Sequence, residues 1–507
     1  MKKLSLLFIT ALSMSYMNAQ DISDAVRYSQ DEVQGTARFK SMGGAFGALG
    51  GDMSALSINP AGSSIFTKSH ASISISNLST KNNVNYFNGV SSSSDNKFDL
   101  NQTGATFVFN NMNADSPWKK FAIGVAYDKV SNFDNFWNVR GVNTNSQSIG
   151  DYFLGYAQGL RLDQISALDN ESLSAAYSDI NKVYGFGNQQ AFLGYESYIL
   201  EPNSNDDANT GYTSNSTGTN FDQEYTYATT GYNGKFSFNA STQYGENFYF
   251  GLNLNSHFIN YEKFTDLYEA NTNAASLIQN VRFQNGLSTI GSGFSFQVGA
   301  IAKVNEGLRV GLSYNSPTWY TISEETTQYL GTVRNEAGSN ISQIIDPFVV
   351  NVYPDYKLQT PGKITGSLAY VFGDQGLISF DYARKDYGST KFKPTSDTYF
   401  SEQNGIMSDV LKSASTYRVG GEYRMKQLSL RGGYRLEESP YKNDSFYGDL
   451  NGYSVGLGYN FGNLSLDLAY DHSQRDYNQQ LYSVGLTDAA MLDTTVDNVT
   501  LTLGFSL

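Results

Sequence analysis

Cysteine is absent from this 507-residue sequence, histidine occurs only three times, and only 16% of the residues are charged. Without cysteine the chain can form no disulfide and no thiolate-based metal site. No apolar run of about 18 residues follows the N-terminal segment, which excludes helical membrane spans. The formal net charge of −14 disfavours nucleic acid as a partner, because phosphate binding needs a positive surface.

Glycine and aromatic residues are abundant instead, with 48 Gly, 37 Tyr and 32 Phe. The chain begins with Lys2 and Lys3, continues with an apolar run, Leu4 to Leu12, and then reaches the small residue Ala19. This layout predicts a secretory signal peptide over residues 1–19. We therefore expect an exported protein, and in a bacterium an exported chain of this kind is periplasmic, secreted or in the outer membrane.

From about residue 70 onward, apolar residues alternate with polar or small ones, which is the period of a β-strand with one apolar face. In the last segment, for example, Leu501, Leu503 and Phe505 alternate with Thr500 and Thr502. A soluble sandwich has the same alternation but carries more charge on its polar face. Fourteen strands are predicted: 70–78, 99–110, 119–130, 225–242, 248–262, 292–304, 308–320, 362–372, 377–388, 415–425, 428–437, 450–461, 463–472 and 496–507.

The links between these strands alternate between short turns and long excursions. An even number of antiparallel strands with this alternation is typical of an outer-membrane barrel, and barrel closure satisfies every backbone hydrogen bond in lipid. We therefore predict an all-β membrane protein, a 14-stranded antiparallel transmembrane β-barrel over residues 68–507, in the outer membrane of a Gram-negative bacterium. Short turns face the periplasm in such barrels, so the C-terminus is expected there and the long loops outside.

Charged residues of the predicted strands are expected to face the lumen, because on the lipid face each would cost about 2–4 kcal/mol. The two-residue turn Lys426-Gln427 pairs Met425 with Leu428 and so places Glu422 opposite Arg431. We predict an ion pair between Glu422 and Arg431 in the lumen. Such charges could form a selectivity filter or simply close the barrel interior, and the second interpretation is favoured.

Residues 20–67 do not alternate like strands and are predicted to form an N-terminal plug. Asp21 to Val33 could form a short helix, and Asp52 could cap another that ends before Pro60. The glycine-rich run 43–51 lacks the Lys-Ser/Thr pair of a phosphate loop. Its small residues instead allow close backbone packing inside a pore.

Four stretches of sequence resemble the FadL-type transporters of hydrophobic compounds. The first runs through Asn59-Pro60-Ala61-Gly62, and the second is Leu308 to Pro317; the runs Gly293 to Ala300 and Tyr417 to Tyr441 are similar as well. The resemblance covers nearly the whole mature chain in matching order. It implies a fourteen-stranded barrel plugged by an N-terminal hatch, which agrees with the strand count.

The resemblance also implies a mechanism, in which ligand is caught among the external loops and passes the plug. Asn59, Pro60, Ala61 and Gly62 would then belong to the plug or gate, as a hinge anchor or as a purely structural turn. In such transporters the exit is lateral, through the third strand. Here the inward residues Ala122, Gly124 and Ala126 would leave room for an opening, or simply space for the plug.

The long loop 131–224 is expected to be external and partly helical, because Leu173, Ala176, Tyr177 and Ile180 follow helical spacing. Its other apolar residues must either form a capture site or pack on one another. The predicted ligand-capture residues are Phe153, Leu154, Leu160, Phe192, Leu193 and Ile199.

The leading hypothesis is passive uptake of hydrophobic small molecules, such as long-chain fatty acids or aromatic hydrocarbons, by a protein embedded in outer-membrane lipid. The alternative is an accessory barrel subunit, or partner-binding protein, of a secretion machine. An apolar tunnel would favour transport, whereas a fully packed lumen would favour a partner role. No catalytic residue, cofactor or metal site is predicted: His257 has no identifiable serine partner, and haem ligation by His257 or His472 would depend on single residues.

Overall fold

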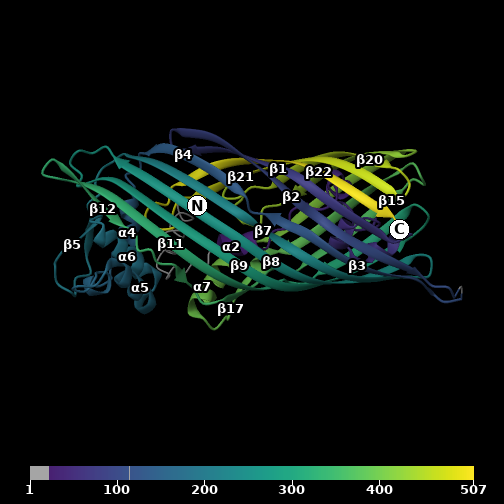
Figure 1. The fold of residues 1–507 in the computed structure, drawn as a ribbon, viewed down its shortest axis with the longest axis horizontal. Helices are drawn as coiled ribbons and strands as arrows, with labels where there is room; N and C mark the ends of the chain where they lie inside the picture. The colour runs from purple at the N-terminus through teal and green to yellow at the C-terminus, as the bar shows by residue number, and fades with distance from the viewer. Residues whose placement is uncertain (1–21, 114, 507) are drawn as a thin grey trace.

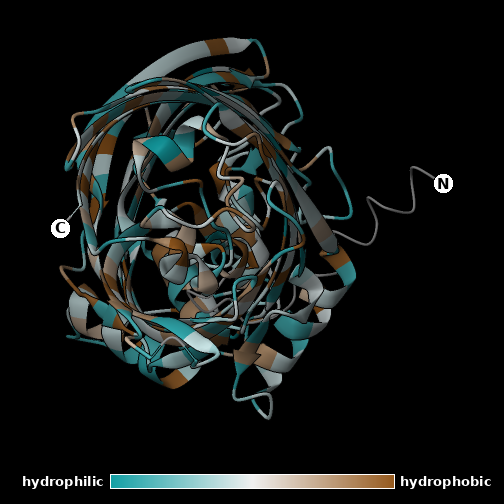
Figure 2. Cartoon of the chain, turned by 90° about the vertical axis from the view of Figure 1, so that its right-hand side faces the viewer, coloured by the Kyte–Doolittle hydropathy of each residue, from teal (hydrophilic) through white to brown (hydrophobic). Residues whose placement is uncertain are grey.

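The computed structural model describes residues 22–113 and 115–506, so the predicted signal peptide lies outside the described residues. Its strands form one closed ring around a filled interior (Figures 1 and 2). The wall consists, in order, of β1 (His70–Tyr86), β2 (Gly89–Asn110), β3 (Trp118–Asn132), β7 (Phe221–Tyr244), β8 (Phe248–Asn271), β9 (Ile278–Lys303), β10 (Leu308–Asn315), β15 (Lys363–Val371), β16 (Gly376–Asp386), β18 (Ser413–Met425), β19 (Leu428–Glu437), β20 (Leu450–Asn460), β21 (Leu464–Gln480) and β22 (Ala489–Ser506).

Every neighbour in this ring is antiparallel, and β22 pairs with β1 to close it, with Ile73 opposite Leu503. The predicted fourteen-stranded antiparallel barrel is therefore confirmed. Closure gives each strand of the wall a hydrogen-bonded neighbour on both sides, although some ladders cover only part of a strand's length. None of the helices among the described residues is both long and apolar enough to span a membrane.

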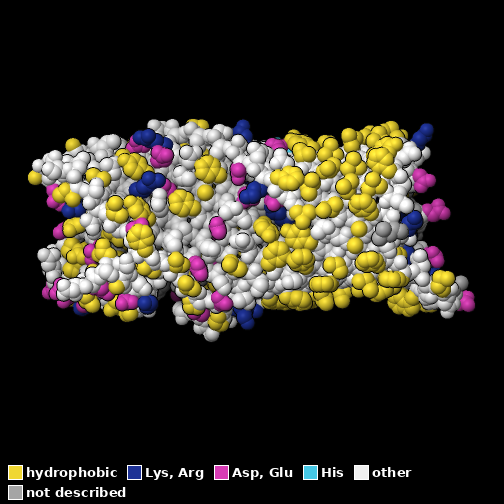
Figure 3. Space-filling model, viewed as in Figure 1, with side chains coloured by type: hydrophobic (Ala, Val, Ile, Leu, Met, Phe, Trp, Pro, Cys, Tyr) yellow, Lys and Arg dark blue, Asp and Glu magenta, His cyan; other side chains and the backbone are white. Residues whose placement is uncertain are grey.

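Hydrophobic side chains cover one part of the outer wall, next to the end that carries the C-terminus (Figure 3). They are the outward residues of the alternating strands, such as Leu312, which is 60% exposed, and Ile290, which is 65% exposed. The other half of the wall carries mixed polar and charged side chains (Figure 3). The apolar band is thus the membrane-facing belt, and the barrel continues well beyond it on one side.

The wall strands are longer than predicted on that side. Residues 79–98 were expected to form a loop, but β1 and β2 continue as a hairpin to Tyr86 and Gly89. β21 and β22 also extend past their predicted ends, to Gln480 and Ala489. These extensions lie beyond the membrane-facing belt, and they carry Ser, Asn and Thr instead of an outward apolar face. The alternation of apolar and polar residues is therefore lost in the sequence, although the hydrogen-bonded ladder continues.

The predicted strand 308–320 is in fact two strands. β10 ends at Asn315, and β11 (Trp319–Glu336) begins after Pro317. Proline has no N–H to donate to a ladder, so the break falls there. β11 extends the wall with four short strands: β12 (Ser339–Ile345), β13 (Asn351–Val352), β14 (Tyr356–Gln359) and, beside β14, β17 (Lys391–Lys393). On the other side of the wall, β4 (Asn135–Asn143) extends β3 alongside β7.

The segment before β1 folds inside the ring, where Figure 2 shows helices and coil enclosed by the strands. It comprises α2 (Ile22–Arg27), α3 (Ala37–Ser41) and the 3₁₀ turns η1 (Ser54–Ser57) and η2 (Pro60–Ile65). Thr36 caps α3 through a hydrogen bond from the Phe39 N–H. Asp52 accepts a bond from the Ser54 N–H, but the helix predicted there is only the 3₁₀ turn η1, and its N-cap residue is Met53 instead of Asp52.

The loop between β4 and β7 forms a helical cap at the end far from the C-terminus (Figure 1). It contains α4 (Ile149–Ala157), η3 (Leu162–Gln164), α5 (Leu173–Tyr184), α6 (Phe186–Glu196) and the hairpin of β5 (Leu200–Pro202) and β6 (Tyr212–Ser214). The helical spacing of Leu173 to Ile180 correctly predicts α5. A further helix, α7 (Thr398–Val410), follows the turn η4 (Tyr387–Ser389) and β17.

Candidate functional site

The middle of the plug lies directly against backbone of the barrel wall. A β-carbon on Gly433 of β19 would lie 2.3 Å from the Gly43 nitrogen, and one on Gly311 of β10 would lie 2.2 Å from the Gly47 carbonyl oxygen. Wall glycines on four more strands approach plug residues 41–42 and 59–61 as closely: Gly251, Gly299, Gly420 and Gly456. The absence of side chains at these sites lets plug residues 41–61 sit closely against six strands of the wall, so this part of the plug is anchored there.

Asn59 is the most heavily bonded residue of this anchored part. Its Nδ2 donates to the carbonyl oxygens of Gly47 at 2.8 Å and Ala300 at 3.0 Å, and its Oδ1 accepts from the Ala61 N–H at 3.2 Å. Pro60 begins η2, and Gly62 packs against Gly50. These contacts are those of a structural anchor. A gating movement at residues 59–62 stays a prediction.

A buried ionic cluster joins the plug to the wall near β18 and β19. Glu422 lies opposite Arg431 in the ladder, and the Arg431 Nε is 2.6 Å from its carboxylate. Arg38 of the plug binds the same carboxylate with its Nε at 2.9 Å, and Arg424 binds it at 2.6 Å. The Glu422 side chain is only 1% exposed, so its carboxylate pairs with three guanidinium groups in a site that water hardly reaches, and Asp467 is a second partner of Arg431 at 2.5 Å.

The plug residues that precede α3 are attached differently, through a few polar contacts. The Asp31 Oδ2 lies 2.7 Å from the Nζ of Lys363 and 3.0 Å from that of Lys385. Lys385 also donates to the Ser29 carbonyl oxygen at 2.6 Å, and the Glu32 N–H donates to the Val130 carbonyl oxygen of β3 at 3.1 Å. Residues 29–34 are therefore held by ion pairs and single hydrogen bonds rather than by interlocked backbone.

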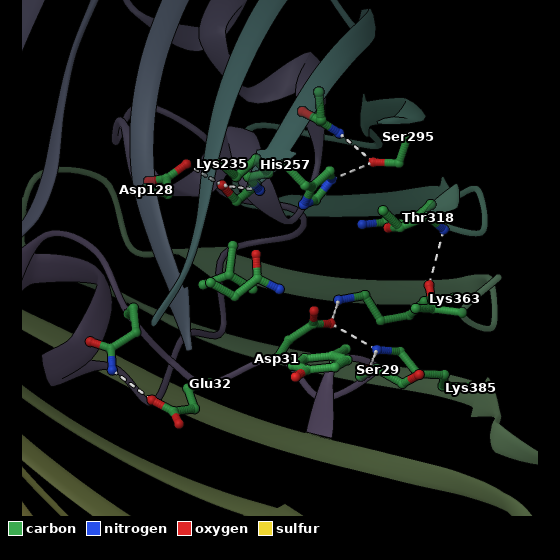
Figure 4. A pocket seen from close by; sticks show the side chains of 18 of the residues that line it. Ser29, Asp31, Glu32, Asp128, Lys235, His257, Ser295, Thr318, Lys363 and Lys385 are labelled. Carbon is green, nitrogen blue, oxygen red and sulfur yellow. Dashed lines mark hydrogen bonds and ion pairs between the residues drawn. The ribbon is translucent and has the colours of Figure 1, made fainter. Parts of the chain in front are cut away.

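This segment borders an internal cavity of about 100 Å³, shown in Figure 4. The side chains around it are mostly polar and charged, and they come from both plug and wall: Asp31, Glu32, Asp128, Lys235, Lys363, Lys385 and Arg418. Lys235 bonds the Ser57 hydroxyl at 3.1 Å, and that hydroxyl donates to Asp128 at 2.8 Å. Small-molecule sites usually measure roughly 300–1,000 Å³. This cavity is smaller, so the route through the barrel is closed in this conformation.

His257 also lines the cavity, and the fold gives it a serine neighbour that the sequence did not reveal. Its Nε2 lies 2.8 Å from the Ser295 hydroxyl of the adjacent strand. Its Nδ1 is buried and, among the described residues, has no hydrogen-bond partner. A catalytic triad would need an acid at that nitrogen, so this pair lacks the orienting group of a serine hydrolase.

Above the cavity, α2 occupies an apolar compartment of the barrel. Ala25, Val26 and Tyr28 are buried there, and the Tyr28 ring contacts Phe133 and Tyr261 edge-on, with centroids 5.9 and 6.3 Å apart. The wall around this helix is aromatic and aliphatic, and it includes Ile259, Leu287, Tyr320, Ile322, Tyr356 and Leu358. Removing α2 would thus uncover an apolar chamber next to the charged cavity.

The small inward residues of the third strand are covered by the plug. Met53 and Leu56 form a buried cluster with Ala126, and a β-carbon on Gly124 would lie 3.3 Å from a Leu56 methyl group. This packing favours the interpretation that these positions make space for the plug. Beyond Gln102 and Asp128 the β2–β3 ladder ends, and Lys129 forms an ion pair with Asp99 across that gap.

The predicted capture residues lie inside the helical cap. Phe153, Phe192, Leu193 and Ile199 are fully buried in one hydrophobic core, and Leu154 and Leu160 pack partly buried against it. This burial favours self-packing of the loop, so a capture role for these six residues stays a prediction. The large apolar side chains exposed nearby are others, such as Phe348 at 90%.

The sequence did not indicate Asp31, Lys363 and Lys385 as a group. Lys363 and Lys385 lie near the facing ends of two neighbouring predicted strands, 362–372 and 377–388, and this placement was a usable signal for their proximity. Asp31 lies more than 300 residues earlier, and only the inward fold of the plug brings it between them. The shared site therefore depends on tertiary structure rather than on a motif.

The fold and site define a class, that of transmembrane β-barrels whose lumen is blocked by their own N-terminal segment. A family model described as outer membrane protein transport protein (OMPP1/FadL/TodX) matches residues 198–506. The chain belongs to this outer-membrane family, and the resemblance seen in the sequence is confirmed. No curated protein matches the chain by sequence.

Two solved structures show the same fold. A FadL homologue of Pseudomonas aeruginosa aligns over 94% of this chain and 99% of its own, with a TM-score of 0.54 and 12% identity. The toluene transporter TodX of Pseudomonas putida aligns over 94% and 99%, with a TM-score of 0.52 and 13% identity. At such low identity the likeness extends to architecture and leaves the ligand open.

Proposed function

We propose that this protein is a passive outer-membrane channel for hydrophobic small molecules, such as long-chain fatty acids or aromatic hydrocarbons. The short turns and the C-terminus face the periplasm in this proposal, and the helical cap faces the exterior. The chain has no enzymatic activity of its own in this account. Family membership supports the proposal, and neither it nor the structural neighbours support the alternative of a secretion accessory subunit.

The observation that carries the proposal is the apolar compartment that α2 fills. Val26 and Tyr28 make apolar contacts there that a hydrophobic ligand could make in their place. Dispersion and the burial of apolar surface favour any apolar group of suitable size, so they do not require these two side chains. The segment 22–34 is the movable part of the plug, since it is held by side-chain packing, ion pairs and single hydrogen bonds and not by interlocked backbone. Residues 41–61 stay fixed in this proposal, because moving them away from the wall would break many close contacts at once.

Transport then follows from exchange. An apolar molecule that enters from the cap displaces α2 from the aromatic compartment, and the segment swings away and opens the cavity below. No energy source is needed, because the ligand moves down its own gradient. The exit is either lateral, beside β3 where the ladder with β2 ends, or axial into the periplasm.

A reversible cross-link tests this proposal. The chain has no cysteine, so Glu32→Cys with Val130→Cys places a single pair where the two backbones are already hydrogen-bonded. We expect oxidised cells to lose uptake of labelled oleate and of toluene, and a reductant to restore it. The matched control joins α3, which leads into the anchored residues 41–61, to the wall through Ala37→Cys and Thr502→Cys, where the Ala37 N–H already bonds the Thr502 hydroxyl at 2.7 Å. Unchanged uptake in the oxidised Glu32–Val130 protein would contradict the proposal.

A further inference from the structure

A second feature lies on the outside of the barrel, where β11, β14 and β17 run side by side. A surface groove of about 310 Å³ is lined by Trp319, Lys357, Leu358, Gln359 and Lys393. Tyr356, Leu358 and Phe392 of these strands are buried in the core. Strand alternation therefore turns the residues between them, Lys357, Lys391 and Lys393, to the outer surface.

The three lysines are close neighbours in the sheet. Lys357 is directly opposite Lys393, and Gln359 is directly opposite Lys391. Like charges facing each other across a ladder destabilise a sheet unless something compensates them. Among residues 22–113 and 115–506 none of these lysines forms an ion pair. The nearest acid along the strand, Asp355, accepts a hydrogen bond from the Ser323 hydroxyl at 2.6 Å.

The cluster stands at the edge of the membrane belt. Trp319, which is 41% exposed, follows β10, whose Leu312 and Tyr314 are exposed, and is paired with Gln359 of the lysine-bearing strand β14. Tryptophan at a belt edge marks the level of lipid headgroups. In Figure 1, β17 lies just beyond the part of the wall that Figure 3 shows covered with hydrophobic side chains. A local surplus of lysine in a protein of net charge −14 also has to be explained.

We propose that this groove binds the phosphate-bearing headgroup of a glycolipid in the outer leaflet, with the phosphate between Lys357, Lys391 and Lys393. Each ammonium group donates charge-assisted hydrogen bonds to phosphate oxygens, and the Trp319 ring packs on the upper part of the acyl chains. The anion removes the repulsion between the facing lysines. This inference uses the proposed orientation, in which this edge of the belt faces outward, but it does not depend on transport.

Binding is tested on the full-length protein in non-ionic detergent, with fluorescent diphosphorylated lipid A as the probe. The variant Lys357→Gln/Lys391→Gln/Lys393→Gln is compared with Lys68→Gln/Lys182→Gln/Lys426→Gln, which removes the same charge elsewhere. At about fivefold per lysine near an anionic headgroup, we expect the first variant to bind at least about tenfold more weakly. The control variant should bind like the wild type, and both should keep the wild-type unfolding temperature.

Three outcomes would overturn the inference: equal binding by the groove variant, equal binding of dephosphorylated lipid A, or displacement of the probe by millimolar inorganic phosphate alone. Orientation is checked with Thr395→Cys, in the exposed turn after β17, by an impermeant maleimide on intact cells. Labelling only after lysis would place the groove in the inner leaflet and also overturn it. Oleate uptake by the same groove variant should be normal, so a failure of transport and a failure of lipid binding give different results.

Discussion

Lys363 and Lys385 lie directly opposite each other across β15 and β16, and the plug residue Asp31 binds both. Without that carboxylate the two ammonium groups would repel each other. Asp31→Asn should therefore loosen the segment 22–34. Two partly exposed ion pairs of roughly 0.5–1 kcal/mol each correspond to about a 5- to 30-fold larger released population.

The measurement for Asp31→Asn is the initial rate of oleate uptake, together with sensitivity to a hydrophobic antibiotic that the closed barrel excludes. Both should rise. Asp31→Glu keeps the charge and serves as the control, with behaviour close to the wild type. If the folded Asp31→Asn protein showed an unchanged uptake rate and an unchanged antibiotic sensitivity, the ion pairs of Asp31 would not restrain the segment 22–34.

Glu422 compensates Arg38, Arg424 and Arg431, so its neutralisation should cost much more than the loss of an exposed pair. Glu422→Gln leaves Arg38 and Arg424 without their ion-pair partner, whereas Arg431 keeps Asp467; the loss of one partner of a buried ion pair costs about 3–5 kcal/mol. We expect a clearly lower unfolding temperature, measured as the shift of the folded band on unboiled gels. Glu437→Gln is the control, because the Arg435 Nε is 3.8 Å from that carboxylate. Equal shifts for both variants would be inconsistent with a special role for Glu422.

The barrel could be predicted from the sequence because lipid enforces a simple rule, apolar out and polar or small in. The prediction failed where that rule no longer applies: residues 89–98 and 473–480 are strands without an apolar face. The turn Lys426-Gln427 was enough to set the register of Glu422 and Arg431, because a two-residue turn fixes every pair after it. No such local rule links Asp31 to Lys363. The charged cavity therefore became visible only with the plug in place.

The close contact between Gly433 and the plug predicts that one methyl group will disturb it. In Gly433→Ala the added β-carbon would lie 2.3 Å from the Gly43 nitrogen and 2.3 Å from the Met42 carbonyl carbon. Backbone cannot yield as a flexible side chain can, so we expect a loss of about 1–3 kcal/mol of stability and faster proteolysis within residues 37–51. Gly366→Ala is the matched control in another strand, since its β-carbon would have nothing within 4 Å. If the Gly433→Ala protein resisted proteolysis as well as the Gly366→Ala protein, the plug would not be tightly packed against Gly433.

Glu269 predicts a pH dependence in the helical cap, outside the membrane belt. Its carboxylate accepts hydrogen bonds from the Ser148 hydroxyl at 2.5 Å, the Ile149 N–H at 2.9 Å and Gln223 at 2.7 Å, and so holds the start of α4. Burial raises the pKa of Glu269, with a further contribution from the charge of Asp151, although these hydrogen bonds oppose the shift. The ionised form is therefore less favourable in the fold than in the unfolded chain.

The sign of the effect follows from that raised pKa. Glu269 contributes no electrostatic penalty below its unfolded pKa, and the penalty grows as pH rises from there through the folded pKa. Exchange protection of the α4 amides, corrected for the intrinsic rate, should thus fall from pH 4 toward pH 7 in the wild type. In Glu269→Gln it should not change over this range. Glu269→Ala should lose protection at every pH, because three donors lose their acceptor at a cost of roughly 1–3 kcal/mol. Protection that instead rises with pH in the wild type would show that the hydrogen bonds, rather than burial, dominate the pKa of this carboxyl group.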